Sequence, residues 1–98
     1  MNAKYWIEVD TYWQGSQSIF IGPFSTREAA EQAARESQAT PCDSMAQDVR
    51  GGTRYEIRNT TQAKRVGMRA HNTLPATVKV PGTVREFEEV ITELADRL

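Results

Sequence analysis

Residues 4–13 alternate between two kinds of side chain, and this pattern constrains the fold more than any other feature of the chain. A period of two, rich in aromatic and β-branched residues, is typical of a β-strand. Turn-forming residues follow at 14–17, and residues 18–21 form a second apolar run. The two runs predict an antiparallel hairpin. One side of the first strand carries Tyr5, Ile7, Val9, Thr11 and Trp13, and the other carries Trp6, Glu8, Asp10 and Tyr12.

Two further strands are expected along the chain. Pro23 should end the second strand, because proline has no N–H group to donate to a sheet ladder. Residues 54–58 alternate again, with Tyr55 and Ile57 on one side, and predict a third strand. Residues 77–80, Thr-Val-Lys-Val, predict a short fourth strand before the turn residues Pro81 and Gly82.

Two helices begin at capping-box patterns, in which a Ser or Thr is followed three residues later by Glu. Ser25 with Glu28 predicts a helix that runs to about residue 38, with a stripe of alanines. Thr83 with Glu86 predicts an amphipathic terminal helix that supplies much of the core. The apolar stripe of this second helix is Val84, Phe87, Val90, Ile91, Leu94 and Leu98.

The segment 60–71 fits two periodicities. Ala63, Val66, Gly67 and Ala70 match the spacing of a helix, whereas Val66, Met68 and Ala70 alternate as in a strand. The opening Thr-Thr-Gln-Ala-Lys-Arg favours a helix, although Gly67 weakens that interpretation.

These elements predict one small α+β domain over residues 1–98. Their order is ββαβ(α)βα, and the expected architecture is a sandwich in which helices pack on one face of an antiparallel or mixed sheet. A chain of 98 residues has room for one core.

Residues 17–36 contain the run Ile19-Phe20-Ile21-Gly22-Pro23-Phe24, followed by an alanine-rich helix. This run resembles the strand–GPF–helix unit of SPOR domains and of similar small bacterial α+β proteins. The resemblance implies a local strand, turn and helix, and SPOR domains bind bare glycan strands of peptidoglycan on their sheet. In this chain an amphipathic helix stands where the family has a closing strand, and fold-level analogy alone does not carry function.

Composition excludes several classes of protein. A single Cys cannot form an internal disulfide, and a single His cannot build a multi-histidine metal site. Neither a secretory signal nor an apolar run long enough to span a bilayer is visible, so we expect a cytoplasmic protein that does not bind a membrane. We expect no cofactor and no metal.

Few residues suggest catalysis, and we expect the protein not to be an enzyme. Cys42 with His71 is the only pair that matches a thiol nucleophile and its base, and no nucleophile motif surrounds the cysteine. Glu8 and Asp10 share one side of the first strand, where paired acids can divide acid and base roles. An exposed sheet explains these two carboxylates equally well.

Charge is distributed unevenly, although the net charge is only -1. Residues 50–71 have a net charge of +5, whereas residues 1–49 have -4 and residues 72–98 have -2. If the basic segment forms one surface, its guanidinium groups suit carboxylates or phosphates. If acids of the same domain pair with these cations instead, each exposed ion pair contributes little to stability. The segment holds Arg50, Arg54, Arg58, Lys64, Arg65 and Arg69 against Glu56.

The interpretation that follows is a small non-catalytic binding module of the interaction, inhibitor or adaptor type. An unidentified protein is the favoured partner; a nucleic acid and a second copy of the chain are alternatives, as are glycan binding of the SPOR type and a Cys42 thiol enzyme. Outward-facing hairpin aromatics would add to the basic segment, since exposed aromatic area marks interfaces. The expected contact residues are Trp6, Tyr12, Arg54, Arg58, Lys64, Arg65 and Arg69.

Overall fold

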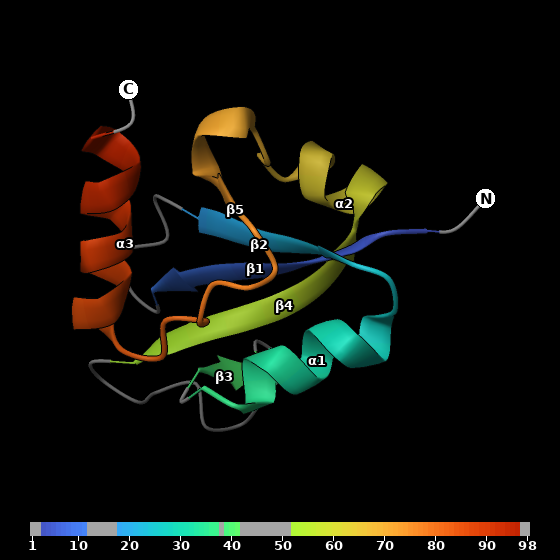
Figure 1. Ribbon diagram of the computed structural model, residues 1–98, viewed down its shortest axis with the longest axis horizontal. Helices are drawn as coiled ribbons and strands as arrows, with labels where there is room; N and C mark the ends of the chain where they lie inside the picture. Colours follow the sequence, from blue (N-terminus) through green and yellow to red (C-terminus); the bar gives the residue numbers. More distant parts are fainter. Residues whose placement is uncertain (1–2, 12–17, 38, 42–51, 97–98) are drawn as a thin grey trace.

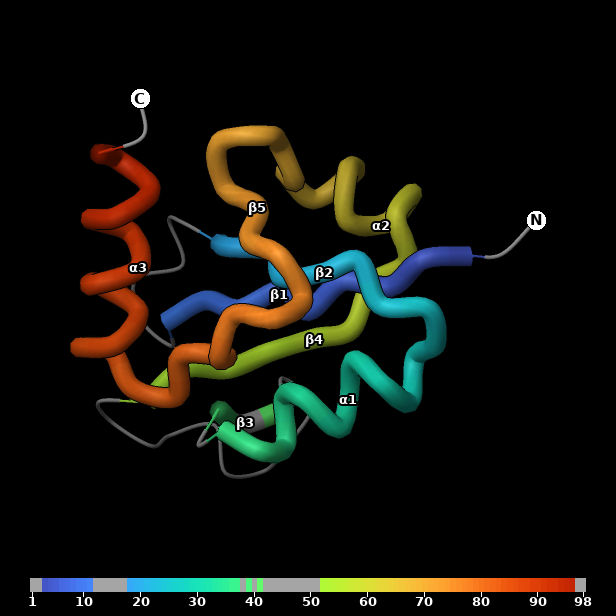
Figure 2. The backbone as a smooth tube through the Cα atoms, viewed as in Figure 1, coloured from blue at the N-terminus to red at the C-terminus, as the bar shows by residue number. Residues whose placement is uncertain are grey.

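The computed structural model describes residues 3–11, 18–37, 39–41 and 52–96. They form a five-stranded mixed sheet in the order β3-β4-β1-β2-β5, flanked by helices (Figures 1 and 2). The strands are β1 (Tyr5–Thr11), β2 (Ser18–Phe24), β3 (Thr40–Pro41), β4 (Thr53–Asn59) and β5 (Thr73–Leu74). The helices are α1 (Arg27–Arg35), α2 (Thr60–Arg65), the 3-10 turn η1 (Ala70–Asn72) and α3 (Val84–Asp96).

The centre of the sheet is antiparallel, with β1 between β2 and β4 as the hairpin pattern predicted. Ile7 lies opposite Ile21 on one side and Ile57 on the other, and Val9 lies opposite Ile19 and Tyr55. This register places the apolar side chains of three strands on one face. The short strands lie at the two edges of the sheet, where β3 pairs in parallel with β4 and β5 pairs in parallel with β2.

Helices α1 and α3 cover that apolar face and complete the main core. Ala30 and Ala34 of α1 are fully buried, since small side chains let the helix approach the sheet closely. Phe87 and Leu94 of α3 belong to the same cluster. Figure 1 shows α1 running along the sheet and α3 standing at its other end. The predicted α+β class with a mixed sheet is confirmed.

The segment with two periodicities is helical over Thr60–Arg65, and α2 packs on the opposite face of the sheet. The expectation that the helices pack on one face therefore holds for α1 and α3 but not for α2. Asn59 caps the helix in a reciprocal capping box with Gln62. Gly67 then takes a φ of 117°, a left-handed conformation that favours glycine and ends the helix. A small second cluster of Phe20, Ala63 and Met68, with Trp6 against it, attaches α2 to the sheet.

The structure corrects three local expectations. Strand β2 does not stop at Gly22 but continues through Pro23 to Phe24, with an irregular register opposite β1. Thr26, not Ser25, caps α1, and its hydroxyl accepts a hydrogen bond from the Ala29 N–H group. Residues 77–80 lie outside the sheet, and the fourth predicted strand is replaced by β5, immediately before Pro75.

The terminal helix begins close to its predicted start. The Thr83 hydroxyl accepts from the Glu86 N–H group, and the Glu86 carboxylate accepts from the Gly82 N–H group. This last hydrogen bond lowers the pKa of Glu86. The buried hydroxyl of Thr53 donates to the carbonyl of Pro81 at 2.7 Å, which ties the segment before α3 to the start of β4.

Candidate functional site

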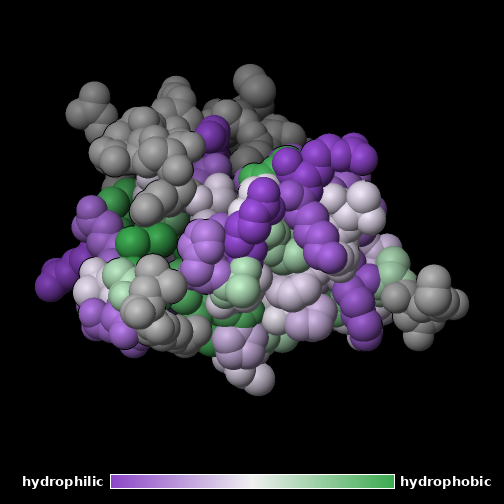
Figure 3. Space-filling model, turned by 90° about the horizontal axis from the view of Figure 1, so that it is seen from above, coloured by the Kyte–Doolittle hydropathy of each residue, from purple (hydrophilic) through white to green (hydrophobic). Residues whose placement is uncertain are grey.

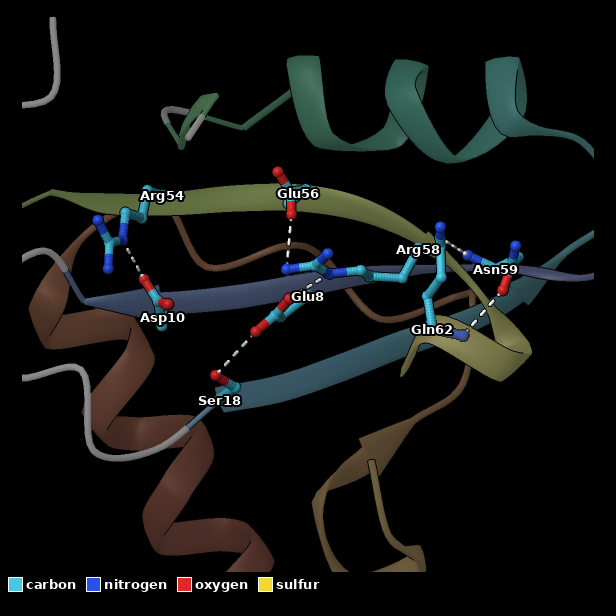
Figure 4. Close-up of polar contacts among 8 residues, drawn as sticks. All are labelled: Glu8, Asp10, Ser18, Arg54, Glu56, Arg58, Asn59 and Gln62. Carbon is cyan, nitrogen blue, oxygen red and sulfur yellow. Dashed lines mark hydrogen bonds and ion pairs between the residues drawn. The ribbon is translucent and has the colours of Figure 1, made fainter. Parts of the chain in front are cut away.

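The face of the sheet opposite α1 and α3 is polar where α2 does not cover it. We call this surface the open face. Its side chains come from three adjacent strands and point to the same side, as Figure 4 shows. The open face consists of Glu8, Asp10, Ser18, Arg54, Glu56 and Arg58.

Arg58 holds two carboxylates that would otherwise repel each other. In the register of the sheet, Glu8 lies directly opposite Glu56, a like-charge pair that destabilises a sheet. The Arg58 Nε atom lies 2.8 Å from Glu8 Oε1, and its Nη2 atom lies 2.6 Å from Glu56 Oε2. The Ser18 hydroxyl donates to the other oxygen of Glu8. The guanidinium therefore bridges neighbouring strands.

Arg54 and Asp10 form the second ion pair of the open face. They are direct cross-strand neighbours, and the Arg54 Nε atom donates to Asp10 Oδ1 at 2.7 Å. The Asp10 side chain is only 15% exposed. Desolvation by burial raises its pKa, and the favourable contact with Arg54 does not fully offset that effect. Repulsion from Glu8 and Glu56 acts in the same direction as burial.

The raised pKa of Asp10 predicts how stability depends on pH. The folded protein binds this proton more tightly than the unfolded chain, so Asp10 should lower the free energy of unfolding as pH rises from its ordinary pKa, near 3.8, through the raised pKa of the folded protein. Urea unfolding from pH 3 to pH 7 tests this by comparison with Asp10→Asn, which cannot titrate. We expect the wild type to lose stability relative to the variant as pH rises. A relative gain would mean that the pair with Arg54 outweighs burial.

These ion pairs separate the predicted basic residues into two groups, those paired with acids on the sheet and those near α2. Arg54 and Arg58 contact acids of their own domain, and the open face as a whole carries three carboxylates against two guanidiniums. It is therefore close to neutral and slightly acidic. The two arginines act within the sheet, where they order the side chains of three strands.

The remaining predicted cations gather at the C-terminal end of α2. Lys64 and Arg65 occupy its last turn and are exposed. Arg69 folds back, and its Nη1 atom donates to the carbonyls of Met68 and Lys64. Within the part of the chain that the structure describes, none of the three forms an ion pair with an acid. Figure 3 shows hydrophilic side chains gathered over the region where Figure 1 places α2.

Trp6 supports this cationic surface from below. Its indole N–H group donates to the Thr60 hydroxyl at 2.9 Å, and its ring packs against the cluster that holds α2. The ring is half-buried, so it positions the helix and offers little open area. Tyr12, the other predicted aromatic contact, lies outside the described residues.

From the sequence, Glu8 and Asp10 are interpreted either as a catalytic pair or as charges on an exposed sheet, and acids elsewhere in the domain are the expected partners if the basic segment pairs internally. The sequence did contain a signal for cross-strand ion pairs, because β1 and β4 each carry charged residues at alternate positions. Once the two strands pair in antiparallel register, Asp10 faces Arg54 and Glu8 lies diagonally from Arg58. Without the register, the sequence could not show which acid meets which base.

The catalytic alternatives are not assembled within the described residues. Cys42 lies outside them, so a pairing with the exposed His71 stays a prediction. Among residues 3–11, 18–37, 39–41 and 52–96, no group of three metal-binding side chains is close enough to hold a metal ion. No helix in these same ranges is both long enough and apolar enough to cross a membrane.

Comparison with known proteins does not assign the chain to a family. No protein-family model matches the chain, and no curated protein or solved structure shows significant similarity to it. The resemblance of residues 17–36 to SPOR domains therefore stays a prediction. In the structure this segment is the end of β2, the turn at Ser25 and Thr26, and α1.

Proposed function

We propose that this chain is a small non-catalytic binding domain that docks an acidic segment of a protein partner. The contact surface is the α2 surface, which we define as Lys64, Arg65 and Arg69. The observation that carries the proposal is the difference between two sets of cations. Arg54 and Arg58 are matched by acids on the sheet. Lys64 and Arg65 instead occupy the exposed last turn of α2, and Arg69 folds back beside them onto backbone carbonyls.

The packing beneath α2 supports a protein partner over a nucleic acid. Proteins that bind single strands combine a cationic groove with exposed aromatic rings on which bases stack. Trp6 is instead held under α2 by Thr60, and Arg27 lies over the ring of Tyr5 at 5.5 Å from its centroid. Three adjacent cations also make a small footprint for a phosphate backbone. Carboxylates suit these three groups well, through charge-assisted hydrogen bonds.

Fluorescence anisotropy tests the proposal with labelled poly-L-glutamate as the acidic probe. We expect the wild type to bind it and the double variant Lys64→Gln with Arg65→Gln to bind five to ten times more weakly. That change corresponds to roughly 1 to 1.4 kcal/mol for two lost ionic contacts. Both positions are exposed, so the double variant should fold normally.

The matched control is Lys79→Gln with Arg85→Gln, which removes the same charge from exposed positions elsewhere. We expect it to bind poly-L-glutamate like the wild type. Equal weakening by both double variants would show that only net charge matters and would refute the α2 surface. Tighter binding of a single-stranded RNA of equal length, with a steep dependence on salt, would place the domain among nucleic-acid-binding proteins instead.

A further inference from the structure

The outer edge of β4 is only partly occupied. Strand β4 has seven residues, but β3 pairs only with Arg54 and Tyr55. Among the residues that the structure describes, no strand pairs with the outer edge of β4 beyond Tyr55. The Asn59 N–H group is already bound by the Gln62 side chain, so the part of this edge that a further strand could extend is residues 56–58. Backbone N–H and C=O groups along such an edge are a template for another strand.

A cleft of about 490 Å³ lies beside this free edge. Four consecutive residues of β4, Tyr55 to Arg58, line it. Because neighbouring residues of a strand point to opposite faces, a cleft lined by four in a row runs along the edge of the strand. Its other lining residues are Arg27, Glu31 and Arg35 of α1, Pro41 of β3 and Gln62 of α2.

The charges around the cleft favour an acidic occupant. Three arginines and two glutamates line it, which leaves one positive charge in excess. Arg35 pairs with Glu31 at 3.1 Å, and Arg58 pairs with Glu56. Arg27 lies over the ring of Tyr5 and forms no ion pair with an acid of the described chain. Arg27 is thus placed to receive a carboxylate.

The cleft also leads toward the α2 surface. Gln62 lines its far end, and Arg65 is three residues further along α2, on a neighbouring position of the same side of the helix. A chain that left the cleft past Gln62 would therefore reach the exposed cations of α2.

We propose that the partner's acidic segment binds in extended form and adds as a strand to β4 at residues 56–58, next to the capping residue Asn59. The proposal rests on the proposed function, because it names the conformation in which that segment reaches α2. Main-chain hydrogen bonds to the edge supply the register, and carboxylates of the incoming strand meet Arg27 and then the α2 surface. Binding of an extended peptide to a free sheet edge is an established mode of recognition.

Nuclear magnetic resonance with short synthetic peptides tests this geometry. The probe is a seven-residue peptide of alternating Thr and Glu, blocked at both ends, added to the ¹⁵N-labelled full chain. We expect its binding to shift the backbone amide signals of residues 56–58 together with those of α2. The same peptide with Lys in place of Glu should cause no such shifts. The double variant Arg27→Gln with Arg35→Gln should weaken binding about fivefold, and Lys79→Gln with Arg85→Gln should not.

Two N-methylated forms of the peptide make the test specific for strand addition. Only every second residue of an added strand donates its N–H group to the edge. Methylation of one alternate set should therefore abolish binding, whereas methylation of the other set should leave it unchanged. If both forms bind as well as the parent and only α2 amides shift, strand addition is refuted and the α2 surface stands. If no acidic peptide binds at all, both proposals are refuted.

Discussion

The substitution Phe20→Ala is expected to lower the free energy of unfolding by about 3 to 5 kcal/mol. Phe20 is fully buried and is the largest member of the small cluster that attaches α2 to the sheet. Removing a buried phenyl ring costs its transfer free energy plus the cavity that is left behind. A domain of this size has roughly 5 to 15 kcal/mol of stability, so the loss is a large fraction of the total. Urea unfolding followed by circular dichroism measures it.

Phe20→Leu is the matched control, because it keeps an apolar side chain in the same place. We expect it to cost clearly less than Phe20→Ala, because it removes fewer buried carbon atoms and leaves a smaller cavity. Phe20→Ala should also weaken the poly-L-glutamate contact, since α2 packs on Phe20 through Ala63 and Met68. If the folded Phe20→Ala variant binds poly-L-glutamate as tightly as the wild type, the α2 surface does not depend on the packing of α2 against the sheet.

The substitution Gly22→Ala is expected to destabilise the protein by about 1 to 3 kcal/mol, although it adds a single methyl group. A Cβ atom at residue 22 would lie 2.9 Å from the Trp6 ring and 2.9 Å from the backbone oxygen of Tyr5. The ring is held in place by its hydrogen bond to Thr60, and the backbone of β1 is fixed within the sheet. Forcing extra volume into such packing costs this much in other cores.

A double-mutant cycle with Trp6→Leu isolates the cause of that loss. If the methyl group clashes mainly with the indole ring, Gly22→Ala should cost less in the Trp6→Leu background than in the wild type. The comparison residue is Gly67, where an added Cβ atom meets no atom within 4 Å but the φ of 117° strains any other residue. Gly67→Ala should be destabilising without any coupling to Trp6. Equal costs of Gly22→Ala in both backgrounds would assign the loss to the Tyr5 oxygen alone.

Much of the fold could be predicted from hydrophobic periodicity, because a long strand or helix shows its period over several residues. The alternation at the start of the chain, the third strand and the terminal helix are each supported by several residues that agree. The strands at 40–41 and 73–74 have two residues each, too few for any period to show. They form where the chain passes the edge of an existing sheet, and that position depends on the tertiary fold.

The candidate site was predicted less well, because its chemistry depends on which side chains face one another. The excess of cations in residues 50–71 was visible, but their separation into two groups was not. Arg54 and Arg58 belong to a strand that lies beside Glu8 and Asp10, whereas Lys64 and Arg65 follow on a helix with no acid close by in sequence. The cleft beside β4 was not foreseen, since its lining residues Arg27 and Arg35 come from a helix distant in sequence.

The way α2 is attached has a consequence for the motions of the molecule. The main core joins three strands to α1 and α3, whereas α2 is held by a few apolar contacts, its capping box and one indole hydrogen bond. Segments with few buried contacts open locally at a lower free energy than the whole domain. Amide hydrogens of residues 63–66 should thus exchange with deuterium faster than those of β1. A partner bound to the α2 surface would slow that exchange selectively, because it would add contacts to the part of the molecule that has few of its own.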